Sequence, residues 1–389
     1  MDFPFGFGQK SSLLLIFFFN GIVFSFLLLK KGIQNNNNAN KWLSFLLFLC
    51  AMYIAPYMLG YAGWYSRKVT REILYFIPFM QVLLIGPVIF FYTKSLLNST
   101  FKISKKEYYH FIPALIYLVY SLIVFITDKL ILDEFYFYAD GRDKDMANWY
   151  QIAGIISMVY YLIASLKFYK NYKKLVFDKV SFADSILFEW IPNFLIAFLS
   201  IVVLRVLLFL LNPEWGNFGN QFWHYIAFSI VVLYVSVNGY ANAVKMSFLN
   251  DVNSESINVY QESDEDYKTK QDNTNLEEIE FWKDKILHLV ESEKVFKNPT
   301  LTLSDLSKLL NTNTKTISKS INSGFDMNFN DFINHYRIEA VKEKLHKEEH
   351  KTSTLLGIAF DCGFNSKATF NRAFKKSIDL SPKDYLKNL

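Results

Sequence analysis

Two short stretches near the C-terminal end carry basic, hydroxyl and amide side chains at the spacing of an exposed helix face. The first stretch contains Lys315, Thr316, Ser318 and Lys319, and the second contains Lys367, Ala368, Asn371 and Arg372. Lysine and arginine neutralise DNA phosphates, arginine pairs with guanine in the major groove, and asparagine pairs with adenine. These residue types indicate recognition of double-stranded DNA rather than a covalent reaction.

The elements that must present the first set follow a helix, turn, helix pattern. Thr302 and Asp305 form the capping box that begins one helix. Asn311-Thr312-Asn313 then makes a turn and offers the N-cap of the next helix. The second helix is predicted over 314–322, with Ile317 and Ile321 facing inward. Two short helices joined by a tight turn are the supersecondary unit that places its second helix in the major groove.

A longer helix, predicted over 329–345, joins this unit to a second copy of the same arrangement. In the second copy Gly363 supplies the turn and Ser366 supplies the N-cap of a reading helix over 367–376. The inward side of that helix consists of Phe370 and Phe374. A single unit of this kind is a weak signal, whereas two in tandem at this spacing are a strong one.

The segment from about 276 to 389 resembles the DNA-binding domain of AraC-type transcription regulators. The residues that carry the resemblance are Ile358-Ala359, Gly363-Phe364, Phe370, Phe374-Lys375, Pro382 and, in the joining helix, Arg337-Ile338. The resembling segment covers roughly a third of the chain, and its motif residues are very specific to the family. Ser320 departs from the family pattern, because this position is usually apolar, and we expect it to loosen the first reading helix.

The resemblance implies two reading helices in successive major grooves on one face of the duplex, about 34 Å apart. By position, the base contacts would come from Lys315, Ser318 and Lys319 in the first groove and from Lys367, Ala368, Asn371 and Arg372 in the second. Thr316 is outward beside the first set. Lys375 and Lys376 would hold phosphates. For any single lysine the alternative is an ordinary solvated charge, and arginine at 372 is the strongest candidate for a base contact.

The whole chain has 52% hydrophobic and 18% aromatic residues, a composition that indicates membrane-spanning segments. Seven apolar runs are about long enough to span a bilayer as helices. They lie at 11–29, 42–61, 73–92, 108–127, 149–169, 190–211 and 223–243. We therefore predict an all-α protein: a seven-helix transmembrane bundle followed by the tandem helix-turn-helix domain.

Loop charge predicts the orientation of the spans. The first, third and fifth loops hold 11 lysine and arginine residues, and the second, fourth and sixth hold 6. The positive-inside rule then places the N-terminus outside and the C-terminal domain in the cytoplasm, where DNA is available. With the resemblance, this predicts a multi-pass protein of the bacterial inner membrane.

Charged residues inside the predicted spans are scarce, and Arg205 is the clearest case. An intramembrane arginine is a functional candidate, although snorkelling to the nearby interface is an equal alternative. Arg205 and Gln81 are therefore candidates for signal sensing. The acidic loop 128–148 is interpreted as a solvated loop, with a cationic ligand as the alternative.

Residues 249–275 are acidic and poor in apolar side chains, which is typical of a flexible linker. The predicted domains are thus a sensor-like membrane module over 1–248, the linker, and the DNA-binding domain over 276–389. We expect no enzyme, cofactor or metal, since no catalytic motif is present and the two cysteines make no metal framework.

The leading interpretation is a one-component transcription regulator whose membrane module responds to an unidentified small-molecule or envelope signal. Expected partners are double-stranded DNA, the lipid bilayer and a second copy of the chain in a homodimer. A transporter or membrane enzyme with a regulatory tail is the alternative, and it predicts several polar side chains converging inside the membrane. A tether whose tail binds protein is disfavoured by the outward basic residues.

Overall fold

The computed structural model describes the chain except for residues 1–5, 7, 99–100, 188–189, 212–217 and 253–275. The described residues form helices and turns with one isolated bridge and no longer strand, so the predicted all-α class is confirmed for them. The chain divides into two compact units. The first contains Met1–Tyr169 and Glu189–Asn258, and the second contains Lys170–Phe188 and Val259–Leu389.

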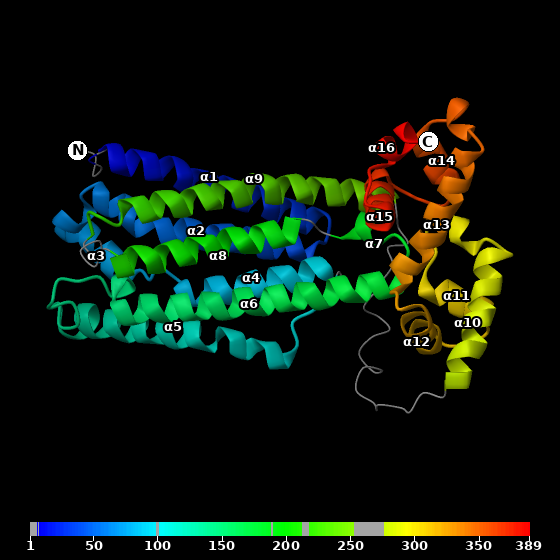
Figure 1. Ribbon diagram of the computed structural model, residues 1–389. Coiled ribbons are helices and arrows are strands. Elements are labelled where there is room, and N and C mark those ends of the chain that lie inside the picture. The colour runs from blue at the N-terminus through cyan, green and yellow to red at the C-terminus, as the bar shows by residue number, and fades with distance from the viewer. Residues whose placement is uncertain (1–5, 7, 99–100, 188–189, 212–217, 253–275) are drawn as a thin grey trace. The chain divides into compact units, whose positions relative to one another are not determined.

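The first unit is a bundle of long helices that run side by side (Figure 1). Its α-helices are α1 (Gln9–Gln34), α2 (Asn38–Tyr61), α3 (Lys68–Phe76), α4 (Val82–Leu97), α5 (Ile112–Phe125), α6 (Asn148–Lys179), α8 (Trp190–Leu211) and α9 (Phe222–Val252). Its 3₁₀ turns cover Trp64–Ser66, Lys105–Phe111 and Lys144–Met146, and a π-helical turn covers Ile126–Ile131. The last part of α6 belongs to the second unit.

Among the described residues, six helical segments are long and apolar enough to cross a membrane. They are Gln9–Gln34, Asn38–Tyr61, Lys105–Ile131, Asn148–Lys179, Trp190–Leu207 and Phe222–Ala243. The predicted span at 73–92 is instead divided between α3 and the shorter α4. Ile77 is extended, with φ −95° and ψ 115°, because the proline that follows it disfavours the helical conformation. The predicted count of seven spans is thus not confirmed.

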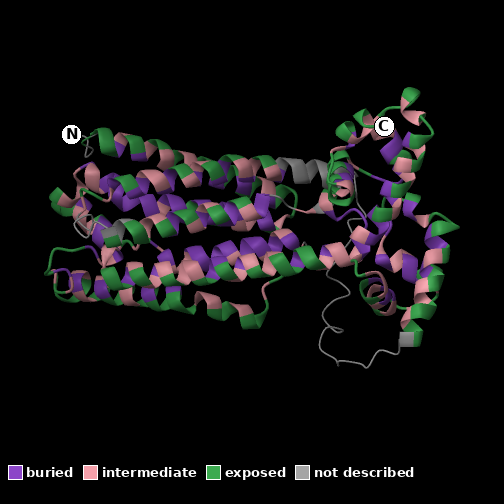
Figure 2. Ribbon diagram, viewed as in Figure 1, coloured by how far each residue is buried: buried purple, intermediate pink, exposed green. Residues whose placement is uncertain are grey.

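Many large apolar residues of these helices are exposed. Figure 2 shows that exposed residues recur along the helices of this unit. Examples are Ile16 and Phe26 on α1, Ile116 on α5, and Ile156 and Ile163 on α6. A helix that is apolar all round needs either protein or lipid on every side. These long apolar helices therefore suggest insertion into a membrane.

The acidic loop between α5 and α6 is partly packed, which corrects the interpretation of it as a solvated loop, although Asp133, Glu134 and Asp140 are exposed. Asp128, Asp143 and Asp145 are buried. Asp145 accepts hydrogen bonds from the Met80 amide at 2.8 Å and from the Tyr117 hydroxyl at 2.5 Å. Burial raises the pKa of both Asp143 and Asp145. These carboxylates cap neighbouring backbone and tyrosine groups.

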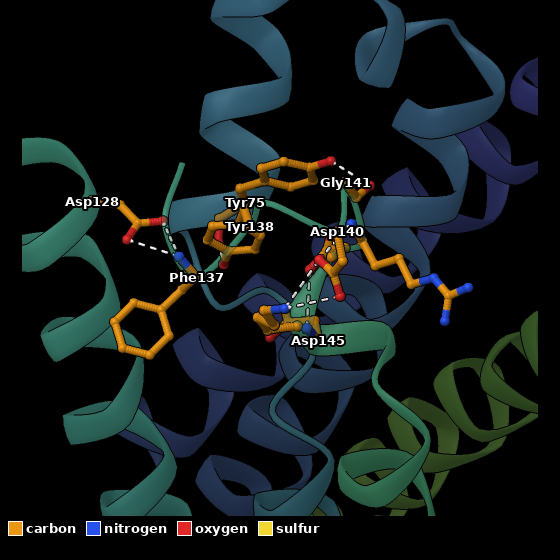
Figure 3. A network of polar contacts seen from close by, with 10 residues as sticks. Tyr75, Asp128, Phe137, Tyr138, Asp140, Gly141 and Asp145 are labelled. Carbon is orange, nitrogen blue, oxygen red and sulfur yellow. Dashed lines mark hydrogen bonds and ion pairs between the residues drawn. The ribbon is translucent and has the colours of Figure 1, made fainter. Parts of the chain in front are cut away.

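Figure 3 shows how this loop is held against α3. The Tyr75 hydroxyl donates to the Gly141 carbonyl at 2.7 Å, and the Tyr138 ring stacks on Tyr75 with centroids 4.3 Å apart. Asp128 accepts from the Phe137 amide at 3.0 and 3.1 Å. The loop therefore has its own folded core, which neither the spacing of its apolar residues nor its acidic composition indicated.

The second unit consists of short helices. They are α7 (Ala183–Ile186), α10 (Leu276–Glu291), α11 (Leu303–Leu309), α12 (Thr314–Phe325), α13 (Phe329–His346), α14 (Leu355–Asp361), α15 (Lys367–Ile378) and α16 (Pro382–Lys387). Two 3₁₀ turns cover Val295–Lys297 and Glu349–Lys351. Most of the predicted linker, residues 253–275, lies outside the described residues.

Helix α13 takes part in both hydrophobic cores of this unit. Phe329, Phe332 and Ile333 belong to the core around α10, α11 and α12. Farther along, Val341 and Leu345 belong to the core around α14 and α15. Because one continuous helix contributes to both cores, the two helix-turn-helix units are held in a fixed relation to each other.

We predict that Asp145→Ala destabilises the first unit, because it leaves the Met80 amide and the Tyr117 hydroxyl without their buried acceptor. Each unsatisfied group costs about 1–3 kcal/mol. The midpoint of thermal unfolding in detergent should fall, while Asp140→Ala, which removes an exposed carboxylate of the same loop, should change it little. Equal effects of the two substitutions would contradict this account of the loop.

Candidate DNA-binding surface

The first reading helix, α12, begins at a cap that the sequence predicted. The Asn313 side chain accepts a hydrogen bond from the Thr316 amide at 2.8 Å. Ile317 and Ile321 are buried, as predicted, and Ser320 is buried beside them at 2% exposure. Of the predicted contact residues, Lys315 is exposed, and Thr316, Ser318 and Lys319 are half-buried.

The second reading helix, α15, repeats this construction. Ser366 caps it by accepting from the Thr369 amide at 3.1 Å, and Phe370 and Phe374 are buried as predicted. The predicted contact residues are all exposed: Lys367, Ala368, Asn371, Arg372, Lys375 and Lys376. The local fold therefore presents this whole set to one side while the phenylalanines anchor the other.

The turn before α15 requires glycine. Gly363 has φ +94°, in the left-handed region that other residues rarely adopt. A Cβ at this position would lie 2.4 Å from the Phe296 carbonyl oxygen, which is closer than real atoms approach. This close approach brings the second helix-turn-helix unit against the turn at Val295–Lys297.

Arg337 of α13 is a charged side chain with no exposed surface. Its Nε donates to the Phe296 carbonyl at 2.8 Å, and Nη2 donates to the Asn298 carbonyl at 2.7 Å. Burial lowers the pKa of Arg337 to about 9. The guanidinium therefore joins α13 to the segment that precedes α11, which gives a physical role to one motif residue of the sequence resemblance.

Two of the basic residues on α15 have acidic partners in the second unit. Lys376 pairs with Asp331 at 2.6 Å, and Arg372 pairs with Asp184 of α7. Lys376 is 64% exposed, so its ion pair is a weak surface contact that phosphate can replace. The Asp184 contact is different, since that carboxylate is only 5% exposed.

A family model described as a helix-turn-helix domain matches residues 306–388. The C-terminal part of this chain carries an AraC-type helix-turn-helix domain. The match supports DNA binding and transcription regulation, and it includes both reading helices. No curated protein and no solved structure matches the chain.

A second group of polar residues lies inside the first unit, around Arg205 of α8. The Arg205 guanidinium donates to the Tyr53 hydroxyl and, at 2.8 Å, to the Gln151 side-chain oxygen, and it lies 2.9 Å from His224 Nε2. These partners come from α2, α6 and α9. No Asp or Glu in the described part of the chain pairs with Arg205.

These four polar side chains line a cavity of about 30 Å³ whose other walls are mostly apolar. His224 is buried, and its Nδ1 has no hydrogen-bond partner among the described residues. Gln81, the other predicted sensing residue, does not line this cavity and instead donates to the Pro78 carbonyl at 2.8 Å. Sequence reasoning did not single out Tyr53, Gln151 or His224, because each lies in a separate apolar run and no local pattern relates one to another.

Proposed function

We propose that this protein is a membrane-embedded, one-component transcription regulator that binds a specific two-part DNA site. The observation that carries the proposal is the pair of capped reading helices, each with apolar residues buried on one side and basic or amide residues outward on the other. Helix α13, shared by both cores, would present them to successive major grooves.

The chemistry of each reading helix fits its proposed role. Arg372 and Asn371 offer the donor patterns that suit guanine and adenine, and Lys375 and Lys376 suit phosphate. On α12, Lys315, Ser318 and Lys319 would contact bases, with Thr316 beside them. Residues 297–389 hold 15 basic and 10 acidic residues, a modest excess, so we further propose that a homodimer strengthens binding.

For the first unit we propose seven membrane crossings. Six are the long apolar segments, and the shorter apolar helix α4 is the seventh. The proposed domains are the membrane module at 1–248, a linker at 249–275 and the DNA-binding domain at 276–389. The distribution of lysine and arginine between loops supports an outside N-terminus and a cytoplasmic C-terminal domain in a bacterial inner membrane.

We also propose that the cavity at Arg205 is the sensing site and that its ligand is a small anion with a carboxylate group. A partly buried guanidinium with only neutral partners is costly in a low-dielectric environment, and an anion would supply the missing charge. The space at this site suits a group about the size of two water molecules. Gln81 stays a proposed sensing residue, outside this cavity.

The alternative of a transporter predicted polar side chains converging inside the membrane module, and four of them do so at Arg205. The space between these side chains is nevertheless small and mostly apolar. Recognition of one small group therefore accounts for the cavity better than passage of a larger substrate, and the DNA-binding domain gives recognition a direct output.

The DNA proposal predicts that the fragment 274–389 enriches a two-part site, with halves one helical turn apart, from a random duplex pool. Arg372→Ala should weaken binding to the enriched site by about tenfold, since a good bidentate base contact contributes about 1–3 kcal/mol. Lys387→Ala removes an equal charge from α16, outside the reading helices, and should have little effect. No enrichment at low salt, even with a fused dimerisation helix, would contradict DNA binding.

The sensing proposal predicts that acetate stabilises the full-length chain in detergent against thermal unfolding, whereas the neutral analogue acetamide does not. Arg205→Gln should weaken acetate binding by at least about tenfold, because it removes a charge-assisted contact. Lys129→Gln, which removes a cation from the outer loop, should leave the shift unchanged. An acetate shift that survives Arg205→Gln would place the anion elsewhere.

A further inference from the structure

The segment Val180–Ser185, which follows α6, is built into the second unit through its backbone. Ser181 donates its amide hydrogen to the Leu301 carbonyl at 3.1 Å, and Val180 forms an antiparallel bridge with Thr302. The Val180 carbonyl accepts from the Asn330 side chain at 3.2 Å. Val180 and Ser181 are both buried. The segment therefore docks in a defined register.

Ser181 also completes the coordination of the buried Arg337 guanidinium. Nη1 of Arg337 donates to the Ser181 carbonyl at 3.0 Å, and Nη2 donates to the Ser181 hydroxyl at 2.9 Å. A buried cation requires its hydrogen bonds to be satisfied. The segment thus supplies two acceptor oxygens that the DNA-binding domain would otherwise have to replace with water.

The end of this segment forms most of helix α7, which contacts the second reading helix α15 (Figure 1). The Asp184 carboxylate pairs with Arg372, and the Ser185 hydroxyl accepts from the Asn365 side chain at 3.3 Å. Asp184 is nearly buried in this contact, while Arg372 keeps half of its side chain exposed. Asn365 lies just before the N-terminal end of α15, and Arg372 lies in the middle of the helix, on the side proposed to meet base edges.

We propose that the segment 180–185 is an intramolecular partner of the α15 reading surface and that it competes with DNA for this surface. The inference rests on the proposed function. Asp184 occupies the guanidinium that would otherwise bind guanine or phosphate, and its negative charge repels the phosphate backbone. Docked, the segment holds the domain in a state of low DNA affinity; undocked, it releases α15.

The position of the segment in the chain gives this contact a path to the membrane module. α6 leads directly into it at Lys179, and α8 begins soon after it at Trp190. Gln151 of α6 and Arg205 of α8 are hydrogen-bonded to each other at the proposed sensing site. A ligand that changes this contact would act on both helices that flank the segment.

The test compares DNA binding by the full-length chain in lipid nanodiscs, with the duplex selected by the fragment 274–389 as probe. Asp184→Asn should increase affinity by about threefold to tenfold, because it removes the charged half of a partly buried ion pair. Asp178→Asn makes the same change in net charge near the end of α6, just before the segment, and should change affinity less than about twofold. A Ser185→Cys and Asn365→Cys pair, joined by a short thiol-specific linker that reductant cleaves, should lose the duplex until reduced.

Each other outcome counts against the inference. Equal gains in Asp184→Asn and Asp178→Asn would show a general charge effect, and no gain would show that the contact does not compete with DNA. A cysteine pair that does not cross-link, or a linked chain that keeps its affinity, would overturn the docking itself. Failure of the fragment and the full-length chain alike to bind any duplex would instead overturn the proposed function, and this inference with it.

Discussion

The architecture of the second unit depends on how a buried guanidinium finds acceptors. Arg337 lies in the middle of α13. Its hydrogen-bond acceptors include main-chain oxygen atoms from the turn at Val295–Lys297, from Asn298 and from Ser181, and the Asn334 side chain of α13 accepts as well. Main-chain carbonyls cannot move away without changing the path of the chain. A single charged side chain therefore fixes the entry to the first helix-turn-helix unit, the joining helix and the docked segment at once.

The partly buried cation of the first unit has a different kind of partner. Arg205 has hydrogen bonds to neutral side chains of three other helices, and each of these can change rotamer without moving a backbone. The contrast separates a structural cation from one that is available to respond. The surrounding cavity also supports a responsive role for Arg205, as does His224 Nδ1, which has no hydrogen-bond partner among the described residues.

Much of the DNA-binding domain was predictable because its signals are local. Caps at Asn313 and Ser366, the buried Ile317 and Phe370, and the glycine turn all depend on residues a few positions apart. The second unit nevertheless includes residues 170–188, which sequence reasoning assigned to the membrane module. No local pattern relates Asp184 to Arg372, since 188 positions separate them.

In the first unit the errors have the same origin. The division of the predicted span at 73–92 follows from the restriction that Pro78 places on the backbone of Ile77. A hydropathy value averaged over about 20 residues does not register this local restriction. The acidic loop was interpreted as solvated because carboxylates are usually exposed. Its tyrosine and backbone donors lie in other parts of the chain, so only the folded structure reveals that Asp145 is satisfied and buried.

The central claim is that one chain holds DNA while it sits in a membrane. The most direct measurement is cross-linking of DNA to the tagged full-length chain in bacterial cells, followed by flotation of the membranes and sequencing of the DNA that floats with them. The account predicts a set of loci that share a two-part site and float with the intact chain. Enrichment only with a soluble fragment, or no enrichment in any fraction, would contradict it.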